Sequence, residues 1–203
     1  MANRDNHYEA AFEAYLRQRG VPYVAVDEAR RSVLADGESI KSLDYIVSSP
    51  GPAVWLVDVK GRRFPSGDDQ SRHYWKNWST RDDLRSLARW EIVFGETFRG
   101  LFVFAYNIVG DRAPLPAGQL FEHRGGLYGF VGVTLADYAA RCHQISPRWD
   151  TVAMPTGEFR QLARPVDEFL FSSRLVPPRA EEIPQLSGAE PIPVADSPWD
   201  FDF

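Results

Sequence analysis

The sequence predicts an α/β domain in which helices flank a central sheet. The first observation is the order of elements in the first half of the chain, which reads helix, three strands, helix, strand. The second is the run at 100–109, which is apolar on both faces, as a strand covered by helices on both sides would be. The third is a β-hairpin at 42–61, where two stretches rich in β-branched and aromatic residues surround a Pro-Gly-Pro turn.

The first helix is expected at 5–19, because aromatic and aliphatic residues recur there at helical spacing before Gly20. A strand at 22–26 and a polar connection at 27–41 lead into the hairpin. The second helix is expected to begin at Ser79 or Thr80 and to end at Gly95. Its predicted buried stripe consists of Leu84, Leu87, Ala88 and Phe94.

The residues from 111 to 174 are expected to continue the same domain, so that the domain spans 1–174. Strands are predicted at 127–134 and 151–154, and helices at 135–142 and at 158–170, the last of them broken near Pro165. A chain of 203 residues is long enough to give one such domain a substantial core.

The net charge of −5 belongs to the C-terminal tail. Residues 175–203 hold one basic and six acidic residues, and removing them from the 23 basic and 28 acidic residues of the chain leaves 22 of each in 1–174. A neutral body does not by itself indicate nucleic-acid binding, so any basic surface must be local.

The tail is expected to be a disordered, Pro-rich and acidic segment, since six of the fifteen prolines lie there with few aliphatic residues. Its tip is aromatic as well as acidic, with Trp199, Phe201 and Phe203. Exposed aromatic side chains gain little unless something buries them. Three interpretations stay open: a solvated tail without a role, a tip that binds a protein partner, and a tip that folds back on the protein's own basic loop.

The hairpin brings three charged residues together. If its strands fold about Gly51, Asp44 lies opposite Asp58 with Cβ atoms about 5 Å apart, and Lys60 shares a face with Asp58. Two like charges in that position destabilise a sheet unless a cation joins them, and Mg²⁺ accepts one or two carboxylates. The alternative is a surface hairpin with solvated charges. Against that alternative, Asp58 interrupts a strongly apolar run at 54–59, where a charge needs a partner.

This segment resembles the PD-(D/E)XK nuclease superfamily, with Asp44 at the first Asp position, Asp58 at the acidic position and Lys60 at the Lys position. Leu43 stands where the pattern has Pro. The resemblance implies a restriction-endonuclease-like αβββαβ core with a mixed central sheet. It also implies Mg²⁺- or Mn²⁺-dependent hydrolysis of phosphodiester bonds in DNA. Asp44, Asp58 and the Val59 carbonyl would then hold the metal, and Lys60 would orient the attacking water or stabilise the transition state.

Glu9 lies at the edge of the buried stripe of the first helix, where it could also be a solvated charge. In archaeal Holliday junction resolvases, which this region resembles, the first helix carries a Glu ahead of an L-x-x-x-G turn into the first strand. Glu9, Leu16 and Gly20 keep that arrangement. The resemblance thus implies that Glu9 holds a second metal or a metal-bound water. Residues 7–13 read HYEAAFE, which is similar to the motif that names the uncharacterised bacterial HYExAFE proteins.

Basic and aromatic residues alternate in the expected loop at 62–81, a composition that suits phosphate contacts and base stacking. The candidate nucleic-acid-binding residues are Arg62, Arg63, Arg72, Lys76 and Arg85. The tryptophans of this loop could instead cover the core. The resemblance also places a polar residue near the metal at the start of the second helix, and Arg85 or Asp83 could fill that position.

These patterns predict a metal-dependent nuclease. Two alternatives stay open: a nucleic-acid-binding protein that keeps the fold without cleavage, and an adaptor whose tail recruits a partner. Cys142 is the single cysteine and cannot form an internal disulfide, so we expect a structural thiol and a reducing, cytoplasmic location. The polar N-terminus does not resemble a signal peptide, and no apolar run is long enough to suggest a membrane span.

Overall fold

The computed structural model of the chain describes residues 6–26, 32–33, 37, 39–67 and 71–173, and every structural statement below refers to these residues. The predicted tail at 175–203, with Trp199, Phe201 and Phe203 at its tip, lies outside them. The expected polar connection at 27–41 is described only in part, including the short paired strands β2 (Ser32–Val33) and β3 (Ser39–Ile40).

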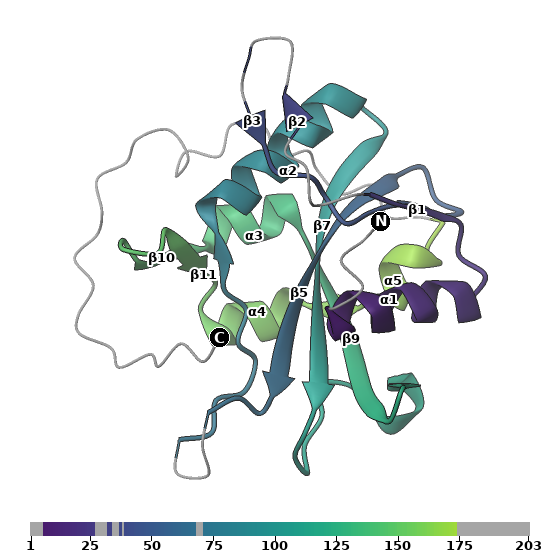
Figure 1. Cartoon of the computed structure of the whole chain (residues 1–203), viewed down its shortest axis with the longest axis vertical. Helices are drawn as coiled ribbons and strands as arrows, with labels where there is room; N and C mark the ends of the chain where they lie inside the picture. The colour runs from purple at the N-terminus through teal and green to yellow at the C-terminus, as the bar shows by residue number, and fades with distance from the viewer. Residues whose placement is uncertain (1–5, 27–31, 34–36, 38, 68–70, 174–203) are drawn as a thin grey trace.

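A mixed seven-stranded sheet forms the centre of the molecule (Figure 1). Its strand order is β1-β4-β5-β7-β9-β12, and β8 extends it by pairing with β9. Strands β5 and β7 run parallel, whereas the other neighbours are antiparallel. The strands are β1 (Tyr23–Ala25), β4 (Tyr45–Ser48), β5 (Val54–Phe64), β7 (Phe98–Ile108), β8 (Phe121–His123), β9 (Gly126–Thr134) and β12 (Arg164–Pro165).

Helices cover both faces of this sheet, as Figure 1 shows. One face packs against α1 (His7–Gln18) and α5 (Asp167–Leu170), and the other against α2 (Arg81–Phe94), α3 (Leu135–Arg141) and α4 (Thr156–Leu162). The core elements follow one another as α1, β1, β4, β5, α2 and β7. The predicted αβββαβ order and mixed central sheet are thereby confirmed.

The two faces of β5 belong to different cores, because successive side chains of a strand point in opposite directions. Trp55, Val57 and Val59 pack with the side chains of α1. Leu56 and Phe64 pack with those of α2. The strand is thus buried on both sides, as its apolar composition predicts.

Helix α2 begins with a capping box. The Thr80 hydroxyl accepts the Asp83 backbone N–H at 3.1 Å, and the Asp83 carboxylate accepts the Thr80 N–H at 3.0 Å. The helix ends at Gly95, whose φ of 96° suits a residue without a Cβ. Both predicted ends are confirmed. The predicted burial of Phe94 is wrong, because its ring lies at the surface beside Trp90 and is 37% exposed.

The second half of the chain follows the prediction in its longer elements. The break expected near Pro165 is β12, a two-residue edge strand that pairs with β9. Proline is tolerated at a sheet edge, where its missing N–H costs no ladder hydrogen bond. A separate three-stranded sheet, ordered β10-β11-β6, joins His143–Ser146 and Thr151–Ala153 to Ser79–Thr80, the two residues that lead into α2. No helix in the described part of the chain could cross a membrane.

Candidate active site

Asp58 and Lys60 lie on the face of β5 that α2 covers, between Leu56 and Phe64 of that core. Their side chains are only 14% and 15% exposed. The Lys60 Nζ atom lies 2.9 Å from Asp58 Oδ1. The predicted shared face is confirmed, and the charge that interrupts the apolar run has its partner two residues further along the same strand.

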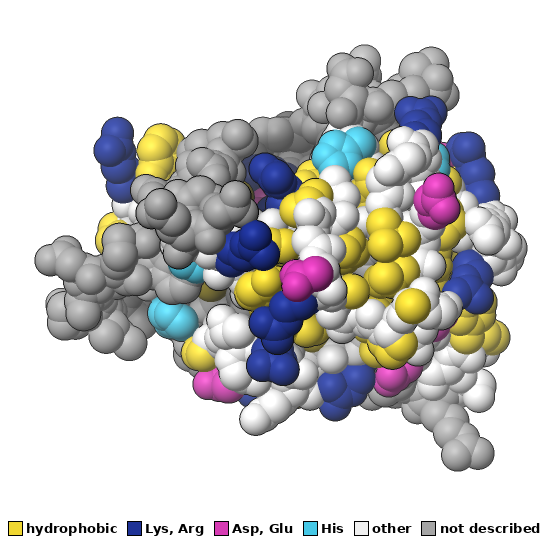
Figure 2. All heavy atoms as spheres, turned by 90° about the horizontal axis from the view of Figure 1, so that it is seen from below, with side chains coloured by type: hydrophobic (Ala, Val, Ile, Leu, Met, Phe, Trp, Pro, Cys, Tyr) yellow, Lys and Arg dark blue, Asp and Glu magenta, His cyan; other side chains and the backbone are white. Residues whose placement is uncertain are grey.

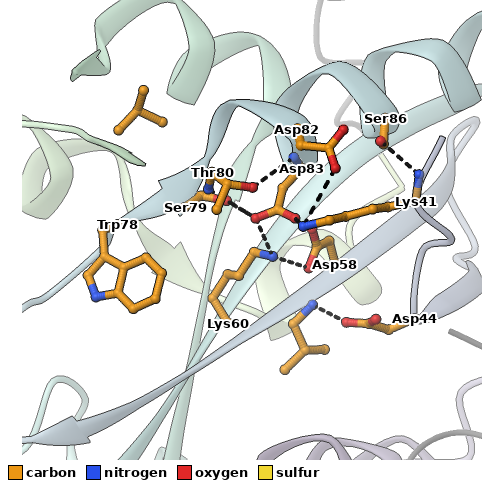
Figure 3. Close-up of polar contacts among 12 residues, drawn as sticks. Lys41, Asp44, Asp58, Lys60, Trp78, Ser79, Thr80, Asp82, Asp83 and Ser86 are labelled. Carbon is orange, nitrogen blue, oxygen red and sulfur yellow. Dashed lines mark hydrogen bonds and ion pairs between the residues drawn. The ribbon is translucent and has the colours of Figure 1, made fainter. Parts of the chain in front are cut away.

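Asp44 stands just before β4, opposite Asp58. Strand β4 pairs with β5 in the register predicted for a turn at Gly51, and the Asp44 N–H continues this pairing by donating to the Val57 carbonyl at 3.0 Å. The Asp44 Oδ2 atom accepts the Val59 N–H at 2.5 Å. The buried Asp44 carboxylate thus accepts a backbone hydrogen bond from β5 at a position that β4 does not reach (Figure 3).

A third carboxylate, Asp83 from the first turn of α2, completes the group. Its Oδ2 atom lies 3.0 Å from Lys60 Nζ, so that the ammonium bridges Asp58 and Asp83. The same oxygen accepts the Ser79 hydroxyl at 3.0 Å and the Thr80 N–H at 3.0 Å. The sequence left open whether Asp83 or Arg85 approaches the site; Asp83 does, whereas Arg85 is exposed.

Lys41 is a member of this group that the sequence reasoning missed. Its Nζ atom lies 2.9 Å from Asp83 Oδ1 and 3.8 Å from Asp82 Oδ2, as Figure 3 shows. Its backbone is fixed to α2, because its N–H donates to Ser86 Oγ at 3.0 Å and its carbonyl accepts the Trp90 indole N–H at 2.8 Å. Lys41, Asp83, Ser86 and Trp90 line a small pocket that also reaches Asp58.

The charges around Lys60 and Asp83 favour the ionised forms of these two side chains. Burial alone would lower the pKa of Lys60, but the neighbouring carboxylates of Asp58 and Asp83 outweigh it and raise that pKa well above its usual range. Burial alone would raise the pKa of Asp83, but Lys60 and Lys41 outweigh it and lower that pKa far below its usual range. Lys60 is therefore charged at neutral pH.

The carboxylate and carbonyl oxygens at this site are of the chemical type that a hard divalent cation binds. Mg²⁺ binds one or two carboxylates and completes its coordination with water and phosphate oxygens. Asp44 and Asp58 supply the carboxylates. The N–H and C=O of one strand residue point to the same strand edge, so the Val59 carbonyl points toward the edge that Asp44 occupies. Within the described residues, however, no group of three or more His, Cys, Asp or Glu is arranged to hold a metal ion.

Glu9 is buried on α1, which packs against the opposite face of the sheet from Asp58 and Lys60. Its carbonyl accepts the Tyr45 hydroxyl at 3.1 Å, and its carboxylate accepts the Asn6 amide. In the described part of the chain Glu9 does not join Asp44 and Asp58 in a three-carboxylate cluster. Its role at a metal stays a prediction.

Arg62 lies within β5 and not in a loop, because the strand continues to Phe64, beyond the predicted end at 61. Its guanidinium stacks on the Trp78 ring at 3.8 Å and donates to the Gly61 carbonyl at 2.6 Å and to the Trp78 carbonyl. Burial lowers the pKa of Arg62 to about 10. In this arrangement Arg62 holds the segment before α2 against β5. A contact between Arg62 and phosphate stays a prediction.

The segment before α2 is attached to the core more firmly than a mobile loop would be. Tyr106 donates its hydroxyl to the Lys76 carbonyl at 2.9 Å, and Tyr138 donates to the Asn77 carbonyl at 2.5 Å. The Trp75 ring packs edge-on against Phe64 and Tyr106. Trp75 therefore covers the core, which was the alternative to base stacking.

The other predicted basic residues remain accessible to a ligand. Arg63, Arg72 and Arg85 are exposed and Lys76 is half-buried. Figure 2, which looks at the molecule from below Figure 1, shows a row of Lys and Arg side chains next to apolar surface, with an acidic side chain between them. A neutral body needs such a local concentration of basic side chains for contact with a polyanion. The use of these side chains for nucleic acid stays a prediction.

Cys142 is buried at the end of α3, and its thiol donates weakly to the Ala139 carbonyl at 3.8 Å. Burial raises the pKa of the Cys142 thiol to about 11. A thiol with that pKa is almost wholly protonated near neutral pH, so Cys142 is a structural residue and not a nucleophile.

Comparison with solved structures finds similar chains. The chain is similar to the Holliday junction resolvase Hjc of Archaeoglobus fulgidus, an archaeal hyperthermophile, with 14% sequence identity over 61% of this chain and 84% of that chain, and a TM-score of 0.33. At that TM-score the likeness does not bear on the site. No family model matches the chain, and no curated protein does either. The grouping with the HYExAFE proteins therefore stays a prediction.

Proposed function

We propose that this protein is a metal-dependent nuclease that hydrolyses phosphodiester bonds in DNA at the site formed by Asp44, Asp58 and Lys60. The observation that supports this most strongly is the contact between the Asp58 and Lys60 side chains on the covered face of β5, with Asp44 at the adjacent strand edge. Burying such charges costs solvation, and charged groups in perturbed environments cluster at functional sites. A hairpin with solvated charges would leave them exposed.

Each residue has a distinct role in this proposal. Asp44, Asp58 and the Val59 carbonyl would hold Mg²⁺ or Mn²⁺, which would supply Lewis-acid stabilisation of the phosphate and a more acidic bound water. The Lys60 ammonium would donate to a phosphate oxygen and stabilise the negative charge that grows in the transition state. With Asp83 as its remaining counter-ion, Lys60 would act as an electrostatic donor.

A nucleic-acid-binding protein without cleavage is the second candidate. The observation that favours it is the alternation of charges along Asp58, Lys60, Asp83 and Lys41, in which every carboxylate already contacts an ammonium. A cation that binds the Asp58 carboxylate would then have to displace the Lys60 ammonium from it. Incubation of the protein with labelled single-stranded, duplex, flapped and branched DNA in Mg²⁺ or Mn²⁺ separates the two candidates. Binding without any metal-dependent product would favour the second.

Arg72→Ala combined with Lys76→Ala is expected to weaken DNA binding and to flatten its salt dependence. Each phosphate contact that is lost lowers the slope of log K against log salt by about one unit, so the double variant should lose about two. Fluorescence anisotropy with labelled duplex at several salt concentrations gives this slope.

The matched control is Arg17→Ala with Arg19→Ala, which removes one positive charge from the last turn of α1 and one from its C-cap. That variant should keep the wild-type slope. Equal slopes in all three proteins would show that Arg72 and Lys76 are solvated surface charges and not phosphate contacts.

A further inference from the structure

The Lys60 ammonium is shared by two carboxylates that belong to different elements. Asp58 lies on the same strand, 2.9 Å from Nζ, and Asp83 lies on α2, 3.0 Å from Nζ. The proposed nuclease chemistry assigns Asp58 to a divalent cation and assigns nothing to Asp83. When a cation occupies Asp58, Asp83 is the carboxylate that remains in contact with the Lys60 ammonium.

Asp83 is suited to be that anion because it is held in place from several sides. Its Oδ2 atom accepts the Ser79 hydroxyl and the Thr80 N–H, and its Oδ1 atom lies 2.9 Å from Lys41 Nζ. The side chain is 9% exposed. It also lies in the first turn of a fourteen-residue helix, where the helix dipole favours a negative charge. A carboxylate with these contacts cannot easily follow a moving lysine.

We propose that Asp83 is the positioning residue for Lys60 and keeps the ammonium in place when a divalent cation occupies the Asp58 carboxylate. This inference rests on the proposed nuclease function, since the cation at Asp58 belongs to it. A cation that approaches Asp58 repels the ammonium beside it. With Asp83 present, Lys60 keeps a counter-ion within hydrogen-bond distance and stays next to the reacting phosphate. Without Asp83, the cation and the ammonium compete for Asp58 alone.

The test follows the reactivity of Lys60 itself and does not require cleavage. The chain contains three lysines, Lys41, Lys60 and Lys76, so their acetylation rates can be measured separately by mass spectrometry of peptides. Asp83→Asn removes the charge but keeps an oxygen that can accept the cap hydrogen bonds. Asp82→Asn is the matched control, because it removes the same charge from the same helical turn. Lys76 serves as the internal reference.

With saturating Mn²⁺, we expect Lys60 to remain protected in the wild type and in Asp82→Asn. In Asp83→Asn it should react about tenfold faster, as expected if one strong ion pair is lost. Ser79→Ala loosens Asp83 without changing its charge and should give a smaller increase, which preserves the test if Asp83→Asn does not fold. Unchanged protection of Lys60 in both Asp83→Asn and Ser79→Ala would overturn the proposal.

The same experiment separates this inference from the nuclease function. Binding of Mn²⁺ is followed by the loss of its free electron paramagnetic resonance signal. If the wild type binds no Mn²⁺, the proposed nuclease site is contradicted, and the metal-free acetylation rates alone decide the role of Asp83. Faster acetylation of Lys60 in metal-free Asp83→Asn than in Asp82→Asn would then support the anchoring, and equal rates would overturn it.

Discussion

Lys60→Met is expected to abolish metal-dependent DNA cleavage and, in metal-free buffer, to lower the free energy of unfolding by about 2–3 kcal/mol. Methionine keeps the length of the apolar stem but leaves Asp58 and Asp83 facing each other without the ammonium that they share. Loss of transition-state stabilisation by one charged donor should reduce the single-turnover rate by about 100-fold or more, while DNA binding persists. Denaturant unfolding and single-turnover cleavage measure the two effects.

Lys41→Met is the matched control for this variant. Lys41 contacts the other oxygen of Asp83, but its side chain is 41% exposed. An ion pair of that exposure contributes about 1 kcal/mol or less. Lys41→Met should therefore cost less stability than Lys60→Met and should retain most of the cleavage rate. If the two variants behave alike in both measurements, Lys60 contributes no more to stability and cleavage than Lys41 does.

Asp58→Asn is expected to remove most of the stabilisation that a divalent cation gives the wild type. A ligand that binds only the folded state at about 100 times its Kd contributes about 2.7 kcal/mol, which corresponds to about 5–10 °C in Tm for a domain of this size. Lys60→Met should show a larger Mg²⁺-induced shift than the wild type, because no ammonium competes for Asp58. Thermal unfolding with and without Mg²⁺ gives the three shifts.

Asp137→Asn provides a control for the general effect of lost negative charge. Asp137 is a half-exposed carboxylate on α3 that pairs with Arg141. This variant should keep the wild-type shift in Tm. Metal-induced shifts of the same size in Asp58→Asn, Asp137→Asn and the wild type would place any bound cation elsewhere on the protein.

The part of the site that is local in sequence could be predicted from the sequence. The period of two along a strand places Lys60 beside Asp58, and the Pro-Gly-Pro turn fixes the register that brings Asp44 opposite. The ends of α2 follow from Thr80, whose hydroxyl caps the first turn, and from Gly95, whose lack of a Cβ suits the positive φ at the end of the helix. The long strands β7 and β9 were predictable because both of their faces are apolar.

The part that depends on contacts between distant elements could not be predicted. The contact between Asp83 and Lys60 depends on how α2 crosses β5, which no periodicity encodes. Lys41 lies in the connection between β3 and β4. The path of this connection depends on the hydrogen bond between the Lys41 backbone and α2. Arg62 was assigned to a loop because the composition changes after Gly61, although pairing with β7 extends the strand to Phe64. Strands of two or three residues, such as β12, are too short to show a period.

Cleavage of a panel of DNA structures by the wild type, with Mg²⁺ or Mn²⁺ and with a chelator, alongside Lys60→Met and Asp58→Asn, tests the proposed site most directly. We expect products from the wild type only when the metal is present, and none above background from either variant, although both still bind DNA. Cleavage by Lys60→Met at the wild-type rate, or wild-type cleavage that persists in the chelator, would contradict a metal-dependent site built on Asp44, Asp58 and Lys60.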